Sequence, residues 1–526
     1  MNPRYITFIF ALAFLVLWWT PRDVFAAPPI LTWEKYYNLG GTTPSLTQNI
    51  AVDSSGNVYV AGRYPSWGTR LIKYDSAGNL IWTTTVNEGG IFYTYNSGVA
   101  ISGDNLYLGM CIQDSTNRTY SGQSKFLTRK YNPATGGVVW ERAYRSPSLS
   151  CMSDIAADPS GNAYASGSYF TSSGDHVART IKYDLNGNIV WNVTYNPTPP
   201  VVSGGLAANY DVPQANAVDI HGNLYELLSG QDGKDLIVMH YRENGSVIKT
   251  KKLDFIGADI AVDSSLNVYV TPLLSVWTGS MYESRVVKYG FPDFNVVWDK
   301  IIPNLYGRGG PAFHGITIDS AQNVYLTGYL SFPTTGPLRL VKLDASGNVV
   351  WDVLGTNVPG SEVGIDSSEN VYTVGIIVGS NSLYTAKYSP PQPPTLNFRV
   401  DATSLSYDTG TILRWDSLYT SSCAASGAWS GGKSTSGSEG TGQLTSSKTY
   451  ILTCSGPGGE ITGRVDISVG AAPPPPPQCS DGRDNDGDGL TDLSDPGCSG
   501  PSDYDESNPA PAPAPAPAPA SCGRSG

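Results

Sequence analysis

Seven copies of one short pattern recur along the first three quarters of the chain, and this repetition limits the possible folds more than any other feature. The copies read IAVDSSGNVYVAG from 50, VAISGDNLYLGM from 99, IAADPSGNAYASG from 155, NAVDIHGNLYELL from 216, IAVDSSLNVYVTP from 260, ITIDSAQNVYLTG from 316 and VGIDSSENVYTVG from 363. Each copy alternates apolar and polar residues on both sides of a turn, which predicts a β-hairpin. Repeat units of this kind bury their apolar faces by stacking on their neighbours.

A second predicted hairpin follows each of the first six copies, as in LIKYDSAGNLIW and LVKLDASGNVVW, whereas the seventh copy stops at YTAKYSP. Four strands per unit at this spacing predict an all-β chain with a seven-bladed β-propeller. The missing strand has a counterpart at the other end of the repeats, ILTWEKYY at 30–37. Its Trp33 matches the tryptophans that end the other units: Trp82, Trp140, Trp191, Trp298 and Trp351, with Lys249 in their place in unit four. We therefore expect the N-terminal strand to close the ring and remove an open sheet edge.

In six of the seven copies, the turn contains an Asp that is followed four residues later by an Asn. The asparagines, which occur in every copy, are Asn57, Asn105, Asn162, Asn223, Asn267, Asn323 and Asn370. The Asp can accept backbone N–H bonds within its own turn. The residue before the Asn is often Gly, but it is Leu266, Gln322 or Glu369 in three copies. Because bulky residues rarely adopt positive φ, we expect the Asn to take the left-handed position. A metal ligand set in every unit is the alternative, but turn chemistry explains both residues.

Residues 30–390 resemble the bacterial β-propeller repeat family known as SBBP repeats, on the strength of these copies. The resemblance implies the fold and leaves the activity open, since propellers have many functions. The stretch NPATGGVVW is also similar to the repeat of pyrroloquinoline quinone dehydrogenases. Only one copy has Thr-Gly, and the adjacent Cys pair of that family is missing, so we do not expect this cofactor.

The two ends of the repeat region indicate export and a change of domain. Residues 1–26 have a basic start, an apolar run and the ending Val24-Phe25-Ala26, which is typical of a cleaved signal peptide. We expect an exported protein, extracellular or on the cell surface, without a transmembrane segment after cleavage. The propeller then occupies 27–390, a Pro-rich linker 391–394, an Ig-like β-sandwich 395–470, a poly-Pro linker 471–478, an acidic loop 479–508 and an Ala-Pro tail 509–526.

The segment 395–470 is similar to bacterial immunoglobulin-like modules of the type SCxASGxWSG…TYxLTC. So small a core would gain from a disulfide, and we expect Cys423 and Cys454 to be bonded. The same segment contains GAWSGGKS at 427–434, which fits the spacing of a phosphate-binding loop. The following TSGSEGTGQLTSS has no helical period, so it cannot supply the helix N-terminus that such a loop needs. We expect a glycine-rich hairpin and no nucleotide.

The acidic loop reads CSDGRDNDGDGLTDLSDPGC and has the spacing of a calcium loop. Asp484, Asp486 and Asp488 occupy positions 1, 3 and 5, Leu490 would offer its carbonyl at position 7, and Asp492 and Asp495 fall at positions 9 and 12. The loop resembles thrombospondin type 3 repeats, and we expect Ca²⁺ to bind and a Cys479–Cys498 disulfide to hold the loop closed. A solvated acidic linker is the alternative. Residues 479–506 hold nine acids and one Arg, which account for −8 of the net charge of −12.

Charge and motifs restrict the function. A net charge of −12 argues against a nucleic-acid partner. The four histidines, His176, His221, His240 and His314, lie in no H-E-x-x-H or G-x-S-x-G motif. We therefore favour a non-enzymatic binding or adhesion protein, with an extracellular glycan or protein as its ligand and the acidic loop stiffening a prolyl stalk. A propeller lyase or hydrolase using His314 and Arg308, and a structural surface-layer component, are the alternatives. Cys111 and Cys151 could pair, and Cys522 could cross-link chains.

Overall fold

The computed structural model describes residues 27–39, 48–64, 68–86, 92–114, 124–145, 150–171, 176–195, 213–229, 236–241, 243–273, 276–277, 282–303, 312–329, 336–356, 358–377 and 382–508. The chain divides into two compact units, residues 1–391 and 392–526, which are described separately. The expected signal peptide and the Ala-Pro tail with Cys522 lie outside the described residues. Among the described residues, no helix combines the length and the apolar character that a membrane crossing requires.

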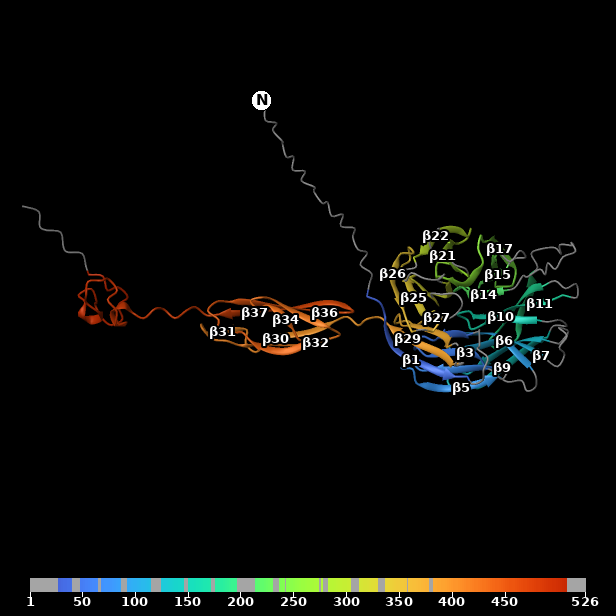
Figure 1. Cartoon of the computed structure of the whole chain (residues 1–526), viewed down its shortest axis with the longest axis horizontal. Helices are drawn as coiled ribbons and strands as arrows, with labels where there is room; N and C mark the ends of the chain where they lie inside the picture. Colours follow the sequence, from blue (N-terminus) through green and yellow to red (C-terminus); the bar gives the residue numbers. More distant parts are fainter. Residues whose placement is uncertain are drawn as a thin grey trace, which may run out of the picture. The chain divides into compact units, whose positions relative to one another are not determined.

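The described part of the first unit consists of seven antiparallel sheets, numbered here in chain order (Figure 1). Sheet 1 contains β2 (Gln48–Val52), β3 (Val58–Tyr64), β4 (Gly68–Tyr74) and β5 (Leu80–Val86). Sheet 2 contains β6 (Phe92–Ser102), β7 (Asn105–Asp114), β8 (Ser124–Tyr131) and β9 (Val138–Arg145). Sheet 3 contains β10 (Ser150–Ala157), β11 (Ala163–Phe170), β12 (His176–Tyr183) and β13 (Ile189–Tyr195).

Sheets 4 to 7 follow the same order of strands, with one short extra strand in sheet 5. Sheet 4 contains β14 (Pro213–Val218), β15 (Leu224–Ser229), β16 (Leu236–Tyr241) and β17 (Val247–Lys252), and sheet 5 contains β18 (Gly257–Val262), β19 (Val268–Pro272), β20 (Val276–Trp277), β21 (Tyr282–Gly290) and β22 (Asn295–Ile302). Sheet 6 contains β23 (Ala312–Ile318), β24 (Val324–Tyr329), β25 (Leu338–Leu343) and β26 (Val349–Leu354). Sheet 7 contains β27 (Gly360–Ile365), β28 (Val371–Ile377) and β29 (Ser382–Ser389) with β1 (Ile30–Asn38).

The sheets form a closed ring. The first strand of each sheet contacts the first strand of the next, and β27 of sheet 7 contacts β2 of sheet 1. The N-terminal strand β1 pairs antiparallel with β29, with Trp33 opposite Lys387, as the sequence predicts (Figure 1). Each pair of neighbouring sheets shares one buried apolar cluster, so the core is divided among the sheet interfaces. This division follows from repeat units that must cover one another's apolar faces.

The turn of each repeat corrects one expectation. In six of the seven repeats, the left-handed residue is the one directly before the Asn; among these, Leu266, Gln322 and Glu369 have φ of 66°, 65° and 58°. The Asn is held otherwise. In sheet 5, the Asn267 side-chain amide donates to Asp263 Oδ2 at 2.8 Å, and its backbone N–H donates to Asp263 Oδ1 at 2.9 Å. The Asn makes this bond to the Asp carboxylate in six repeats, and the network holds even a leucine at positive φ.

The second unit begins with two packed sheets. One contains β30 (Thr395–Val400), β32 (Ile412–Leu418) and β35 (Ser436–Gly440); the other contains β31 (Ser404–Leu405), β37 (Gly459–Val469), β36 (Lys448–Gly456), β33 (Ser422–Gly427) and β34 (Gly431–Lys433). Trp415 and Trp429 lie at their interface with Phe398, which stacks on Trp429 at 5.6 Å between ring centroids. The disulfide Cys423–Cys454 is present and joins directly opposed residues of β33 and β36. It therefore links two strands of one sheet.

The GAWSGGKS segment begins at the last residue of β33, passes through a turn and β34, and ends directly after β34. The ammonium group of Lys433 pairs with Glu439 at 2.6 Å and lies over the ring of Trp429. Both contacts belong to the sandwich, so the lysine has a structural role. Beyond the sandwich, residues 478–508 contain only two short 3₁₀ turns among loops, η1 (Gln478–Ser480) and η2 (Asp492–Ser494).

Candidate metal centre and the inner ring

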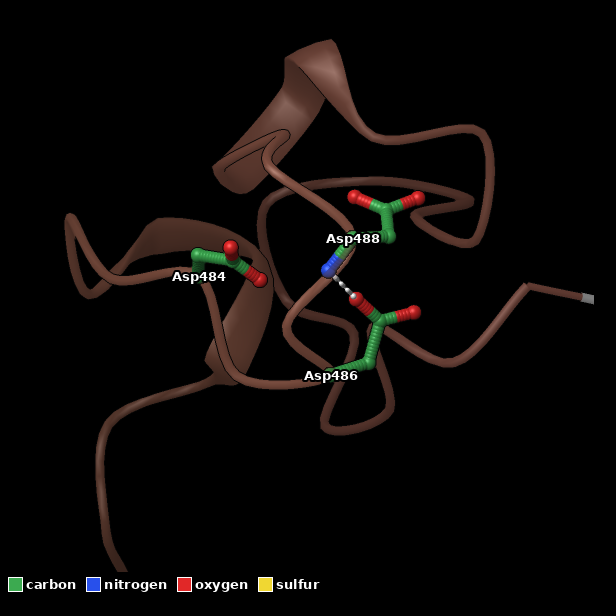
Figure 2. A group of neighbouring side chains, drawn as sticks. All are labelled: Asp484, Asp486 and Asp488. Atoms are coloured by element: carbon green, nitrogen blue, oxygen red, sulfur yellow. Dashed lines mark hydrogen bonds between the residues drawn. The ribbon is translucent and has the colours of Figure 1, made fainter.

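Three carboxylates of the acidic loop converge. Asp484, Asp486 and Asp488 each place an oxygen within 4.8 Å of the others, and all three side chains are exposed. Figure 2 shows the three side chains on neighbouring parts of the loop, with the hydrogen bond from the Asp488 N–H to Asp486. This is the only such carboxylate, histidine or cysteine group within the described ranges. The D-x-D-x-D-G spacing therefore brings together the three residues at positions 1, 3 and 5.

Backbone bonds of the loop hold these carboxylates in place. Asp484 accepts the N–H groups of Gly487 and Gly489 at 2.6 and 2.8 Å, and the Asp488 N–H donates to Asp486 at 3.1 Å. Gly487 and Gly489 have φ of 80° and 93°, which glycine adopts without strain. Each carboxylate oxygen has two lone pairs, so an oxygen that accepts an N–H can still bind a cation.

The later positions of the predicted calcium loop lie differently. Asp492 and Asp495 are not members of the converging group. Asp492 accepts the Gly482 N–H at 2.9 Å. Asp495 is 2% exposed; one of its oxygens accepts the Gly497 N–H at 2.6 Å, and the other, Oδ2, is buried without a hydrogen-bond partner among the described residues. Leu490 has a half-exposed side chain, and only its backbone carbonyl could serve as a ligand in the predicted calcium loop.

Glu506 is a residue of the site that sequence reasoning missed. Its side chain is fully buried, and its two oxygens accept the N–H groups of Asn485 at 2.7 Å and Asp492 at 2.6 Å. The carboxylate thus ties together both ends of the predicted loop. Glu506 lies eighteen residues after Asp488, outside the calcium spacing, and no sequence signal marks it.

The acidic loop is also closed covalently. The predicted disulfide Cys479–Cys498 is present, with a Cα–Cα distance of 5.6 Å. A cross-link of this span stabilises a small domain by about 3 kcal/mol. In the first unit, Cys111 is disulfide-bonded. The side chain of Cys151 lies outside the described part, so the pairing of these two residues stays a prediction.

The donor set of the acidic loop fits calcium. The three converging carboxylates supply oxygen donors of the kind that Ca²⁺ and Mg²⁺ prefer. No His or free Cys that would favour zinc accompanies them in the converging group. The nine acids between 479 and 506, opposed by only one Arg, repel one another without a cation. The residues present are therefore consistent with a calcium site built on Asp484, Asp486 and Asp488.

A second set of acids lines the inner strands of the ring. Asp154 on β10, Asp259 on β18 and Glu362 on β27 occupy the same position in sheets 3, 5 and 7. Asp154 accepts the Asn216 N–H of the next sheet at 2.9 Å, and Asp259 accepts that of Ile316 at 2.8 Å. Burial raises the pKa of Asp154 and of Asp259 to about 7 each, against backbone N–H bonds that lower it. Burial, with repulsion from Asp259 and Asp154, raises the pKa of Glu362 well above its usual range.

The inner acids do not form a single metal site, since their oxygens do not converge as those of the acidic loop do. Their place is set by sheet-to-sheet packing. A Cβ at Gly98, the equivalent residue of sheet 2, would come within 2.8 Å of Asp154, and one at Gly315 would meet Glu362. Small residues in the intervening sheets thus leave the room that the inner acids occupy.

The catalytic alternative of the sequence rests on His314 and Arg308. His314 lies on β23, where its ring stacks on Tyr329 at 4.9 Å, and burial lowers its pKa. Its Nε2 is buried without a hydrogen bond to any described residue. Arg308 lies outside the described residues, so the structure does not test this pair.

Comparison with known proteins supports the ring architecture. Residues 37–63 match the β-propeller repeat family SBBP. An uncharacterized WD repeat-containing protein of Acanthamoeba polyphaga mimivirus is 22% identical over 434 residues, which cover 58% of this chain and 31% of that protein. The chain thus spans about a third of its relative. With its ring of repeated antiparallel sheets, the chain is a β-propeller repeat protein.

Two solved structures resemble part of the chain at low sequence identity. The WD40 domain of Toxoplasma gondii coronin has a TM-score of 0.44 and 12% identity, and the match covers 70% of this chain and 89% of that one. An inactive variant of virginiamycin B lyase from Staphylococcus aureus, solved with quinupristin, has a TM-score of 0.41 and 11% identity, covering 67% and 98%.

Proposed function

We propose that this protein is an exported, non-enzymatic interaction protein whose seven-bladed propeller binds a ligand outside the cell or at its surface. The observation that supports the proposal is the closed ring of repeated sheets together with the SBBP match. A ring of this kind presents broad surfaces of loops on a rigid scaffold, which suits binding. The mimivirus relative is described as a WD repeat-containing protein, which agrees with an interaction role.

The second unit would act as the spacer of this protein. An Ig-like sandwich with an internal disulfide is a stable module of small size. Prolyl segments such as PPPPP from 473 are extended and semi-rigid, as stalks require. We assign the acidic loop to the same role, because a bound cation would cross-link its carboxylates and stiffen the end of the stalk.

Calcium would be held by Asp484, Asp486 and Asp488, with the Leu490 carbonyl as a further oxygen donor in the same loop. When bound, the cation would neutralise carboxylate charge that the chain leaves unpaired. The chain's own contribution is positioning: Glu506 binds the backbone at Asn485 and Asp492, and the Cys479–Cys498 disulfide closes the loop. A short Asp at position 12, and described residues on either side of the loop that form no α-helix, favour affinity in the roughly submillimolar to millimolar range of extracellular sites.

Calorimetric titration of the oxidised full chain with calcium tests this site. We expect a saturable heat that Asp486→Asn plus Asp488→Asn removes, because these changes keep the shape of the loop and delete two charges. Asp503→Asn is the matched control, since Asp503 lies in the same unit but bonds Ser499 instead of joining the converging group. Absence of heat at about 10 mM calcium, well above the expected range, would reject the site.

The interaction role is tested by exposing the full chain to glycan arrays and to intact cells. Saturable binding to a glycan, or to a protease-sensitive surface, is the expected result. Binding to neither would favour a structural surface component and overturn the proposal.

A further inference from the structure

Neighbouring sheets of the ring are joined by a recurring polar contact. The Trp that ends one sheet donates its indole Nε1–H to a backbone carbonyl in the last turn of the next sheet. The pairs are Trp33 with Ser76 at 3.1 Å, Trp82 with Pro133 at 3.1 Å, Trp140 with Leu185 at 3.0 Å, Trp191 with Glu243 at 2.6 Å and Trp298 with Ala345 at 3.2 Å. The contact explains why the Trp recurs at the end of the repeat.

A lysine of the third strand often donates to the same carbonyl. Lys73 binds the Pro133 carbonyl at 2.9 Å, and Lys130 binds that of Leu185 at 3.1 Å. Sheet 4, which has Lys249 in place of the Trp, keeps the contact: Lys249 donates to the carbonyl of Pro292 at 3.1 Å. The carbonyl contact is therefore a property of the ring, and in two of these places the acceptor belongs to a proline.

The contact is incomplete between sheets 6 and 7. Sheet 7 has no last turn of its own, because its third strand β29 ends at Ser389 and its fourth strand is the separate β1. Trp351 accordingly has no carbonyl partner among the described residues. A cavity of about 160 Å³ lies beside it, which we call the ring-closure pocket; its walls include Tyr325, Lys342, Trp351, Glu369, Pro390 and Pro391.

The ring-closure pocket has an aromatic wall and one hydrogen-bond donor, the Trp351 indole N–H, that is not already bonded to a described residue. Trp351 and Tyr325 lie edge to face, with 6.1 Å between ring centroids. Lys342 lies over the Tyr325 ring at 5.0 Å, and its charge is paired with Glu369 at 2.7 Å. A fitting ligand therefore carries no net charge, packs an apolar ring on the aromatic wall and supplies a carbonyl oxygen to the indole N–H.

We propose that the ring-closure pocket binds an extended proline-containing peptide, whose prolyl carbonyl accepts the Trp351 indole N–H. Pro133 already places a prolyl carbonyl at the equivalent position between sheets 1 and 2. The walls of the pocket also include Pro29, Pro390 and Pro391, so the chain's own prolyl residues already border this surface. Polyproline II segments expose unbonded carbonyls and bind aromatic grooves at low entropic cost. The inference rests on the proposed interaction role and names its site and ligand class.

The test uses the full chain and a blocked, fluorescently labelled peptide of six Ala-Pro repeats, with an Ala-Ser peptide of equal length as the control. Fluorescence anisotropy should show saturable binding of the Ala-Pro peptide only. Trp351→Phe keeps an aromatic ring and removes the N–H, so we expect binding about fivefold weaker, as for the loss of one hydrogen bond. Trp298→Phe is the matched variant, because its N–H is already bonded to Ala345 and it lies at another junction.

A second measurement does not depend on variants. A photoreactive Ala-Pro peptide bound to the wild-type chain should cross-link to residues of the ring-closure pocket. Failure to bind at about 1 mM, equal affinity of Trp351→Phe and wild type, or cross-links elsewhere would each overturn the inference. If the peptide fails while a glycan or cell surface binds the Trp351→Phe chain as well as wild type, the interaction role stands without this pocket.

Discussion

Replacing Asp154 by Asn should stabilise the propeller at pH 8 and leave its stability unchanged near pH 4. Asp154 lies on the inner strand β10, where it accepts the Asn216 N–H at 2.9 Å. An Asn side chain keeps an oxygen acceptor in that place and removes the charge. The pKa of Asp154 is raised to about 7 by burial, so the folded protein binds a proton there more tightly than the unfolded chain. This contribution to stability is complete below the unfolded pKa of 3.8 and is lost as the pH rises through 7.

The magnitude follows from the two pKa values. The difference between about 7 and 3.8, at about 1.4 kcal/mol per pKa unit, corresponds to about 4 kcal/mol in the free energy of unfolding. This figure is an upper bound, because the Asp154 side chain is only partly buried and solvent screens its charge. Asp259 and Glu362 also have raised pKa values and interact with Asp154, so removing one charge eases the ionisation of the others.

Urea unfolding of wild type and Asp154→Asn, followed by tryptophan fluorescence at several pH values, measures the effect. The variant should gain up to about 4 kcal/mol at pH 8, and the gain should shrink to zero toward pH 4. Asp75→Asn is the control, since its turn hydrogen bonds to Asn79 lower the pKa of the Asp75 carboxyl. The reasoning would be refuted if the Asp154→Asn chain were less stable than wild type at pH 8. It would also be refuted if the difference in unfolding free energy between variant and wild type were the same at pH 8 and at pH 4.

Three further predictions concern single contacts. Arg339→Ala should lower the unfolding free energy by about 3–5 kcal/mol, because Arg339 and Asp352 form a buried bidentate pair. Arg285 lies at the same place in sheet 5 and pairs with the more exposed Asp299, so Arg285→Ala should cost about 1 kcal/mol. Equal losses of stability in urea unfolding would contradict this. Leu266→Gly should raise stability by about 1 kcal/mol through relief of positive φ, and a lower melting temperature would argue against it. Glu506→Ala should weaken calcium binding by at least about tenfold in calorimetry, as loss of a positioning residue does, while Glu460→Ala on the sandwich should leave it unchanged.

Repetition made the ring predictable from sequence. Seven copies with a missing last strand, and a matching Trp33 near the start, lead directly to the β1–β29 pairing. The turn could not be resolved in the same way. Propensity argues against positive φ at Leu266, but the bonds from Asn267 to the Asp263 carboxylate outweigh that local preference. Single-residue propensity is a weak guide where side chains and backbone bond each other within a turn.

Part of the structure of the acidic loop follows from short-range sequence spacing, and part depends on residues further along the chain. Asp484, Asp486 and Asp488 converge because their spacing alone places them on one tight turn. Asp492 and Asp495 extend the calcium spacing in sequence, but the backbone turns at η2 and these side chains bond Gly482 and Gly497 instead. Glu506 returns to the loop from further along the chain, and no short-range pattern could reveal that contact. Trp351 was visible in the sequence as part of a series, but its missing partner becomes apparent only when the ring is closed.

The most direct test of the calcium site measures hydrogen exchange of the oxidised full chain by mass spectrometry, with about 10 mM calcium and with a chelator. Amides of residues 479–498 should exchange more slowly with calcium, above all those of Gly487 and Gly489, which bond Asp484. Peptides of the ring between 48 and 389 should be unchanged. Equal exchange of residues 479–498 in both conditions, or protection that Asp486→Asn plus Asp488→Asn leaves intact, would contradict a calcium site built on these aspartates.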